Sequence, residues 1–326
     1  MQIGLMVSAL AGLAPTDLAS YAESLEYDAV WVGELWQESS VVQLAEMATA
    51  TDEITIGSAI LNVFSRSPAV LAMTAASLDR ASDGRFVLGT GVSTEGAVRT
   101  MHGMAFERPV RRAHETIEIV QALLAGGDPV SYDGEVQSVS EVPPVEAEVP
   151  IYHAGLGPAN RRVVGRLCDG WIPHNLPFSG LDDSFSVVAE AAEERGRDPE
   201  SITVAPYVPA AVSDDEAEAR DVLRRHVAYY AGSGEGYRQA VATEYPAAAE
   251  AIGEAWARDD RETAAAAVTD EMVDDLGVAG DAETVRARFQ TLVDETVIDH
   301  PIVVVPVPSS ETMATQTITE LAPSNW

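Results

Sequence analysis

The 326-residue sequence contains no lysine and only one cysteine. Arginine therefore supplies all 20 Lys and Arg positions, against 52 acidic residues, and the formal net charge is −32 at pH 7. Such a surface repels itself in dilute buffer, whereas molar salt shortens the screening length to about 3 Å. The composition predicts a halophilic protein, from a haloarchaeon or similar organism, more strongly than an ordinary acidic protein. DNA, RNA and anionic membranes are poor partners for this surface.

The other absences narrow the class of protein. Cys168 has no second cysteine for a disulfide or a Cys-x-x-Cys motif, so we expect a buried small side chain rather than a reactive thiol. No apolar run approaches the ~20 residues that cross a bilayer, and the first residues resemble a strand rather than a signal peptide. We therefore expect a cytoplasmic protein without a membrane partner. No His, Asp and Glu spacing indicates a metal site.

Strand and helix patterns alternate along nearly the whole chain, which is typical of a parallel sheet covered by helices. Short apolar runs predict strands at 3–8, 28–33, 54–61, 85–88, 149–154, 170–173, 201–212 and 301–305. Helices are predicted at 15–26, 41–50, after Pro68, and at 108–124, 158–167, 185–195, 213–230 and 281–293. Eight strands predict an α/β fold, a (β/α)8 TIM barrel with insertions, as a single domain over 1–326. A doubly wound open sheet is the alternative, but no Gly-x-Gly-x-x-Gly follows the first strand.

Two segments interrupt the alternation, and both are predicted to be insertions. Within 125–148 the residues alternate around Asp133-Gly134, which is a β-hairpin signal. Residues 231–277 are acidic, contain many Ala and Gly residues, and lack a regular strand pattern, so we expect a helical insertion there.

Residues 53–91 carry the strongest functional signal. They predict a strand, a polar turn ending at Pro68, a helix and a second strand. Gly89 and Gly91 are expected just past the end of the second strand, where bare backbone can approach a ligand. The carboxyl ends of these strands therefore indicate a cofactor site.

Five motifs, in this order, resemble the bacterial luciferase-like superfamily, and particularly the branch that uses the deazaflavin coenzyme F420 and includes methylenetetrahydromethanopterin reductase. The motifs lie at 27–34, 56–68, 84–91, 150–171 and 278–285. The resemblance covers essentially the whole chain. It implies a barrel that holds an isoalloxazine-like ring at the carboxyl ends of its strands.

The resemblance also implies which residues contact the ring. A bulge behind the ring falls at Ser58, Ala59, Ile60, Leu61 and Asn62, and the Ala59–Ile60 peptide bond is expected to be cis. Three consecutive residues, Gly89, Thr90 and Gly91, are expected to place their backbone close to the ring, beside the bulge.

By the same resemblance, the cofactor phosphate is expected at the start of the helix that begins with Pro158. The residues that lead into it are Ala154, Gly155, Leu156 and Gly157. Free N–H groups and the helix dipole favour an anion at such a position. Asn160, Arg161 and Arg162 are close in sequence, although the arginines could equally be solvated cations that offset the acidic surface.

Glu34 and His174 are the candidate catalytic residues, since each follows a predicted strand at the cofactor edge. Several relatives have an Asp-His pair where this chain has Glu34-Leu35, so only a carboxylate role carries over. Trp36 is expected to lie against the ring. His102, in the loop beyond the fourth strand, is a further candidate for acid or base chemistry. For both histidines a structural role is the alternative, because the sequence offers no orienting partner.

The resulting prediction is an F420-dependent oxidoreductase that moves a hydride between the deazaflavin ring and a small organic substrate. An FMN-dependent luciferase-like monooxygenase is the first alternative, since the fold holds both ring systems. A non-catalytic flavin-binding barrel is the second, because the Asp-His pair is missing. Sugar-phosphate dehydrogenases of the branch that this sequence resembles bind the substrate phosphate with lysines, so the absence of lysine disfavours a sugar-phosphate substrate. Relatives commonly pair through barrel helices, so a homodimer is expected.

Overall fold

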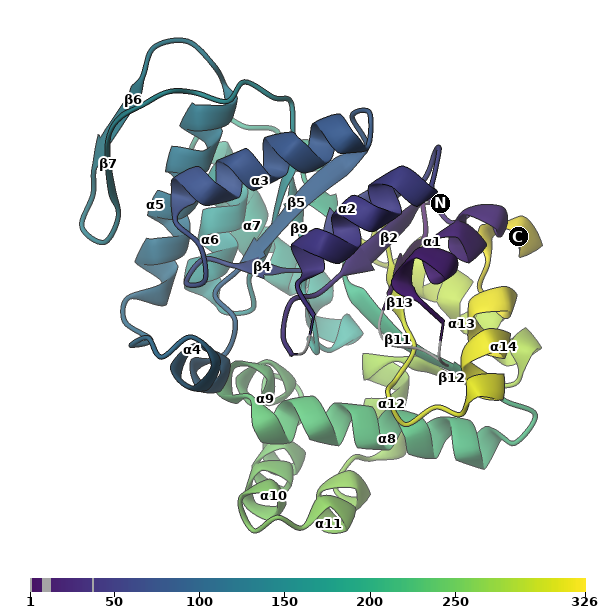
Figure 1. The fold of residues 1–326 in the computed structure, drawn as a ribbon. Helices are drawn as coiled ribbons and strands as arrows, with labels where there is room; N and C mark the ends of the chain where they lie inside the picture. The colour runs from purple at the N-terminus through teal and green to yellow at the C-terminus, as the bar shows by residue number, and fades with distance from the viewer. Residues whose placement is uncertain (1, 8–12, 37) are drawn as a thin grey trace.

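The computed structural model describes residues 2–7, 13–36 and 38–326, with parallel strands at the centre and helices around them (Figure 1). The central strands are β1 (Gly4–Met6), β2 (Ala29–Val32), β3 (Thr55–Ser58), β5 (Phe86–Gly91), β8 (Ile151–Ala154), β9 (Gly170–Trp171), β10 (Thr203–Val204), β11 (Tyr207–Val212) and β13 (Ile302–Val304). Each hydrogen-bonded pair among them is parallel. Ser8, predicted to end the first strand, lies outside the described residues.

The barrel closes because β10 and β11 are two parts of one strand. β10 pairs with β9, β11 pairs with β13, and β13 pairs with β1. Across the interruption, the N–H of Ala205 donates to Trp171 O at 2.8 Å and the N–H of Tyr207 donates to Pro173 O at 3.0 Å. Pro206 between them has no N–H to donate. The described strands thus confirm the predicted (β/α)8 barrel rather than the open sheet.

Ten helices within the described ranges flank the barrel strands, and several of them begin with a residue whose side chain caps the first turn. They are α1 (Pro15–Ser24), α2 (Ser40–Ala50), α3 (Pro68–Ala81), α4 (Glu95–Met101), α5 (Pro109–Leu124), α6 (Pro158–Leu167), α7 (Leu181–Glu193), α8 (Glu216–Ser233), α13 (Ala282–Glu295) and α14 (Glu311–Glu320). The Asp281 carboxylate accepts the N–H of Thr284 at 2.8 Å. Sequence analysis missed α4 and α14, which start in the same way, with Thr94 and Ser310 accepting N–H groups.

The two segments that interrupt the alternation contain their own elements. The first holds the antiparallel pair β6 (Val130–Asp133) and β7 (Ser138–Val142), which projects from the barrel in Figure 1. The second holds α9 (Glu235–Val241), α10 (Pro246–Ala257), α11 (Arg261–Ala266) and α12 (Asp270–Leu276), followed by β12 (Val278–Gly280). That 125–148 and 231–277 are insertions stays a prediction.

The barrel interior is filled around Trp31. A Cβ atom at Gly57 would lie 2.3 Å from the Trp31 ring, so glycine leaves the space that the indole occupies. At the carboxyl end of this interior, Ile60, Ala154 and Tyr207 are only partly buried. These side chains therefore form the base on which any ligand at that end would rest.

Outside the barrel interior, Cys168 is fully buried and unpaired, as expected, and burial raises the pKa of its thiol.

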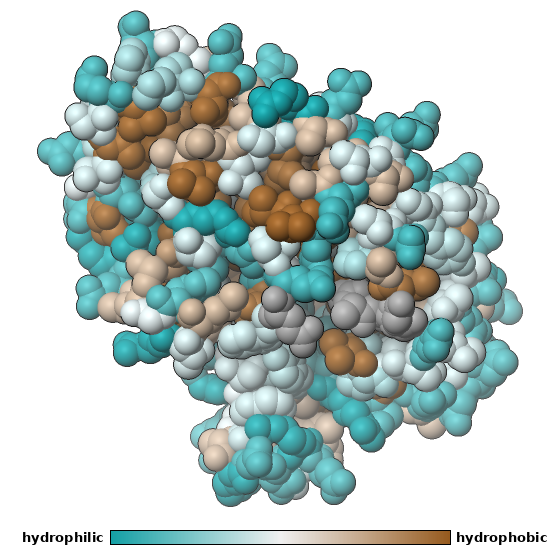
Figure 2. Space-filling view, viewed as in Figure 1, coloured by the Kyte–Doolittle hydropathy of each residue, from teal (hydrophilic) through white to brown (hydrophobic). Residues whose placement is uncertain are grey.

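The helices α2 and α3 expose apolar side chains: Val42, Val70 and Met73 are 56%, 46% and 56% exposed. Figure 2 shows apolar groups over the face that these helices form. Within the described ranges, no helix has the length and apolar character needed to span a membrane.

Candidate cofactor site

The carboxyl ends of the barrel strands meet at one edge of the molecule because the strands are parallel. The helices α4, α8 and α9 lie at this end (Figure 1). β3 stops at Ser58, and the chain resumes as β4 (Leu61–Asn62), which pairs with β5. The Ala59–Ile60 peptide bond between them is cis, which confirms that prediction. The cofactor role of these residues stays a prediction.

Ser58 and Gly89 are locked together by two reciprocal hydrogen bonds. Ser58 Oγ donates to Gly89 O and accepts from Gly89 N–H, both at 2.9 Å. A Cβ atom at Gly89 would lie 1.8 Å from Ser58 O, and one at Gly91 would lie 3.0 Å from the Ile60 side chain. Only a glycine at position 89 therefore allows β5 to approach the bulge this closely.

One expectation about these glycines was wrong. Gly89 and Gly91 lie inside β5, not just past its end, because the ladders to β4 and β8 extend as far as Gly91. Between them, Thr90 faces β8, and its Oγ1 lies 3.0 Å from His153 Nδ1. Burial lowers the pKa of His153 to about 4, so this imidazole is neutral at pH 7.

The Ala59 carbonyl is fixed by a residue that the sequence did not single out. The Tyr207 hydroxyl donates to Ala59 O at 2.5 Å, from a position 148 residues along the chain. A Cβ atom at Gly33 would lie 2.9 Å from the same oxygen. The carboxyl ends of β2 and β3 and the start of β11 thus converge on this carbonyl, beside the partly buried Ile60. We call Ser58–Ile60 with Gly89–Gly91 the backbone platform.

Glu34 follows β2 and forms a two-pronged ion pair with Arg66. Its Oε1 lies 2.6 Å from Arg66 Nη2, and its Oε2 contacts Nη1. The Glu34 and Arg66 side chains are 8% and 17% exposed. Burial raises the pKa of Glu34, but the hydrogen bonds and charge of Arg66 outweigh burial, so the pKa lies below its ordinary value. At neutral pH Glu34 is therefore a carboxylate that can accept a proton but has none to donate.

Asn62 organises the turn after the bulge. Its Oδ1 accepts the N–H groups of Phe64 and Ser65 at 3.0 and 2.8 Å, and its Nδ2 lies 3.0 Å from His102 Nε2. Leu61 beside it is fully buried. The structure thus brings Asn62 and His102 together, whereas Trp36, which was expected to wall the ring, is 55% exposed.

The start of α6 provides unpartnered hydrogen-bond donors. Gly157 is the N-cap and has no side chain to satisfy the first N–H groups, and a Cβ atom there would meet nothing within 4 Å. In the described part of the chain, Arg161 Nε is buried without a hydrogen-bond partner. Burial lowers the pKa of Arg161, and no carboxylate among the described residues counters this effect. The Arg161 guanidinium lies 5.8 Å from the centroid of the Trp171 ring. A phosphate at this helix start would give both the helix and Arg161 a partner.

The residues around this helix start differ in their exposure. Ala154 and Leu156 are partly buried, and Gly155 O accepts the indole N–H of Trp171 at 2.7 Å. Asn160 is partly buried, and its Oδ1 has no partner among the described residues. Arg161 is likewise partly buried, with an Nε that has no partner there, whereas its neighbour Arg162 is exposed.

His174, which follows β9, is buried under tyrosines. Its ring centroid lies 4.5 Å from that of Tyr207, 4.2 Å from that of Tyr230 and 5.2 Å from that of Tyr237. Burial and the nearby His226 hold the pKa of His174 well below its ordinary value. His174 is therefore a neutral imidazole at pH 7, packed against three tyrosine rings.

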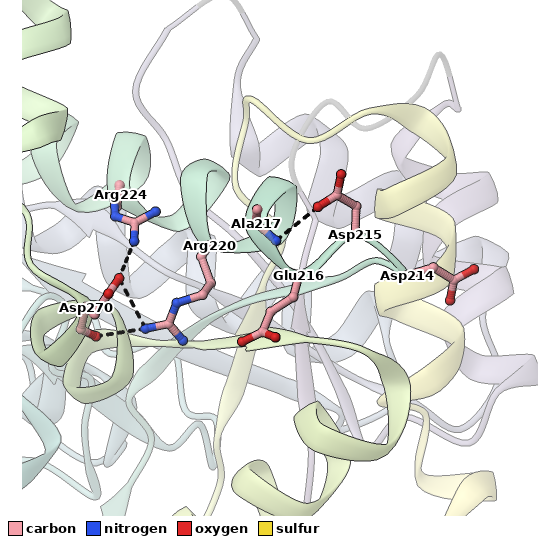
Figure 3. A pocket seen from close by; sticks show the side chains of 7 residues that line it. All are labelled: Asp214, Asp215, Glu216, Ala217, Arg220, Arg224 and Asp270. Atoms are coloured by element: carbon pink, nitrogen blue, oxygen red, sulfur yellow. Dashed lines mark hydrogen bonds and ion pairs between the residues drawn. The ribbon is translucent and has the colours of Figure 1, made fainter.

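A separate groove of about 740 Å³ lies at the start of α8 (Figure 3). It is lined by Asp214, Asp215, Glu216, Ala217, Arg220, Arg224 and Asp270. Both arginines pair with Asp270, and Asp215 caps α8. Because its cations are already paired, we do not assign this groove to the cofactor.

A closed barrel whose carboxyl edge combines a backbone platform with a helix start that lacks a side-chain cap is typical of barrel proteins that bind phosphate-bearing cofactors. A comparison with known sequences gives the family. The chain belongs to the luciferase-like monooxygenase family, whose sequence profile matches residues 14–300.

Similar proteins cover most of the chain. A putative coenzyme F420-dependent oxidoreductase from Mycobacterium tuberculosis is 26% identical over 320 residues, which cover 89% of this chain and 91% of that protein. The 5,10-methylenetetrahydromethanopterin reductase of Methanolobus tindarius is 28% identical over 285 residues, 85% of each chain. The solved structure of the coenzyme F420 dependent tetrahydromethanopterin reductase from Methanopyrus kandleri matches 99% of this chain and 97% of that chain, with a TM-score of 0.82 and 23% identity. This structural match supports the fold.

Proposed function

We propose that the protein is an F420-dependent oxidoreductase that transfers a hydride between the deazaflavin ring and a small organic substrate. The unpaired donors at the start of α6 carry this proposal. In a chain with 52 acidic residues, a partly buried arginine that pairs with no carboxylate of the described residues is best explained by an anionic ligand. The names of the similar proteins support F420 as that ligand.

The residues present fit such a cofactor. When bound, the deazaflavin supplies the hydride chemistry, and the chain supplies position and charge. The backbone platform and the bulge that continues through Leu61 and Asn62 support the ring. The residues from Ala154 to Gly157 and Arg161 hold the phosphate. Glu34 stays ionised beside Arg66, and as a carboxylate it can accept a proton at this edge.

FMN is the alternative cofactor, because its phosphate would use the same helix start. A barrel that binds a flavin without catalysis is the other alternative. A fluorescence titration at molar salt with F420 and with FMN separates these proposals. The main proposal requires F420 to bind; tight binding of FMN without F420 would overturn it. Binding of neither would favour a non-catalytic barrel.

The titration includes two matched variants. Arg161→Gln removes the unpaired cation, and F420 affinity should fall at least about tenfold, since a charge-assisted hydrogen bond contributes about 1.5–3 kcal/mol. Arg195→Gln removes an exposed arginine just after α7, and F420 affinity should not change. Equal affinities of the two variants would contradict the assignment of the phosphate to α6.

We also propose a homodimer that forms through α2 and α3, in a cytoplasm of high salt. Burying Val42, Val70 and Met73 against a second copy would remove an exposed apolar surface from water. Sedimentation at molar salt should give the mass of a dimer for the wild-type protein and of a monomer for Met73→Glu. A monomeric wild-type protein would refute this part of the proposal.

A further inference from the structure

Five aromatic side chains gather beside the backbone platform, and we call them the Tyr–His cluster. They are His174 after β9, Tyr207 in β11, His226 and Tyr230 in α8, and Tyr237 in α9. His226 lies 4.9 Å from Tyr230, and Tyr230 lies 5.2 Å from Tyr237, between ring centroids. The cluster thus joins the barrel to the helices that follow its seventh strand.

The two imidazoles of the cluster have unused hydrogen-bonding atoms. His174 and His226 are 7% and 5% exposed, and neither Nε2 atom has a partner among the described residues. Both amide atoms of the adjacent Asn175, which is 4% exposed, are also unpartnered there. Buried polar groups nearly always have a partner, so these atoms indicate a ligand or ordered water.

The cluster also borders the solvent. Tyr207, Tyr230 and Tyr237 are each partly exposed, while the two histidines are buried. A small molecule that packs against the tyrosines would contact aromatic rings and lie near the imidazoles, since the His174 ring is 4.2–5.2 Å from the three tyrosine rings. Such a surface suits a ligand that has both an apolar part and a polar group.

None of the five side chains of the cluster is charged at pH 7. Burial and His226 lower the pKa of His174, and burial lowers the pKa of His226 to about 4, so both are neutral at pH 7. Burial and neighbouring tyrosines raise the pKa values of Tyr207, Tyr230 and Tyr237, so these groups are neutral too. A carboxylate or phosphate bound here would lose its hydration without gaining a counter-ion.

Tyr207 connects the cluster to the platform. Its ring packs against His174 at 4.5 Å, and its hydroxyl donates to Ala59 O in the bulge. A molecule held by the cluster would therefore lie beside a ring that rests on the platform. This adjacency is what a hydride acceptor or donor needs.

We propose that the Tyr–His cluster binds the substrate, and that the substrate is an uncharged organic molecule with a carbonyl or hydroxyl oxygen on a flat apolar group. The oxygen hydrogen-bonds to the free imidazole nitrogens of His174 and His226, and the apolar group packs on the tyrosines. The assignment of this ligand as substrate rests on the proposed oxidoreductase function. The binding itself does not.

A matched pair of probes tests the proposal without cofactor. Acetophenone is an uncharged aryl ketone, and 4-acetylbenzoate adds a carboxylate to the same skeleton. Binding of each to the cofactor-free protein is measured at molar salt by saturation-transfer NMR and by calorimetry. Acetophenone should bind at least about tenfold more tightly, because only the carboxylate must be desolvated without a partner. Equal or tighter binding of 4-acetylbenzoate, or no binding of either probe, would overturn the proposal.

Three variants locate the binding. His174→Phe should weaken acetophenone binding about tenfold, as expected for one lost hydrogen bond. His174→Gln keeps a donor and an acceptor and should restore part of the affinity. His114→Phe, in α5 next to Glu118, is the control and should bind as the wild type does. If melting curves show that all variants are folded and His174→Phe still binds normally, the proposal is wrong.

F420 titrations of the same proteins separate this proposal from the proposed function. If F420 binds but acetophenone does not, the assignment of the cluster fails and the oxidoreductase proposal stands. If acetophenone binds and F420 does not, the cluster is a ligand site and the oxidoreductase proposal fails.

Discussion

Replacing Gly89 by alanine tests the backbone platform most severely. The new Cβ atom would lie 1.8 Å from Ser58 O, 2.9 Å from Ser58 C and 3.3 Å from Ile172 Cδ1, whereas ordinary contact begins at 3.4 Å. The backbone at residue 89 must therefore move away from the backbone of Ser58 by roughly 1.5 Å, although protein interiors are packed as densely as organic crystals. The same movement disrupts the two hydrogen bonds between Ser58 and Gly89.

The expected loss of unfolding free energy follows from these contacts. Overpacking costs about 1–3 kcal/mol and each lost hydrogen bond about 1 kcal/mol, so Gly89→Ala should lose about 3–5 kcal/mol. For a chain of this size the melting temperature should fall by roughly 5–10 °C. F420 affinity should fall at least about tenfold, because the platform is displaced.

The assay compares circular-dichroism melting curves and F420 titrations at molar salt. Gly96→Ala is the control: this glycine is exposed in α4, and its added Cβ would meet only Thr94 Oγ1, at 4.0 Å. Alanine there should stabilise the helix by up to about 1 kcal/mol. If Gly89→Ala melts at the wild-type temperature and binds F420 normally, the reasoning about the platform is refuted.

Three further predictions concern charge and hydrogen bonding. Glu34→Gln should lower the unfolding free energy by about 1–2 kcal/mol at pH 7, since Arg66 loses a largely buried partner. Because the pKa of Glu34 is depressed in the folded protein, this stabilisation is present above the ordinary value of 4.5 and is lost as pH falls below it. Urea titrations from pH 7 to pH 3 should show wild type and variant converging; a constant difference would contradict this. Ser58→Ala should cost about 1–3 kcal/mol in urea titration, because it leaves Gly89 N–H unpaired, and an unchanged stability would count against this contact. Lowering salt from molar to tens of millimolar should lower the melting temperature, whereas an unaffected melting temperature would defeat the halophile prediction.

The barrel could be predicted because local signals agree with it. The helix predicted at 158–167 is present as Pro158–Leu167, where Pro158 follows a glycine N-cap. The interruption of the seventh strand was missed, since Pro206 breaks the ladder inside an otherwise continuous apolar run. The cis bond at Ala59–Ile60 was predicted from the family resemblance, not from the residues themselves.

The contacts that define the candidate site could not be read from the sequence. Glu34 meets Arg66 across 32 residues, and Tyr207 meets Ala59 across 148. Both contacts exist only once the barrel has closed. The packing of Tyr237 on His174 depends on the path of the chain from α8 into α9, and for 231–277 the sequence shows only an acidic, helical composition. Sequence analysis therefore located the edge of the barrel but not the partners of its polar groups.

The most direct test of the central claim is a crystal structure of the protein grown at molar salt with saturating F420. The account predicts that the deazaflavin ring lies against Ser58–Ile60 and that the phosphate contacts the start of α6 and Arg161. A ring bound elsewhere, or an empty platform at saturating F420, would contradict the account.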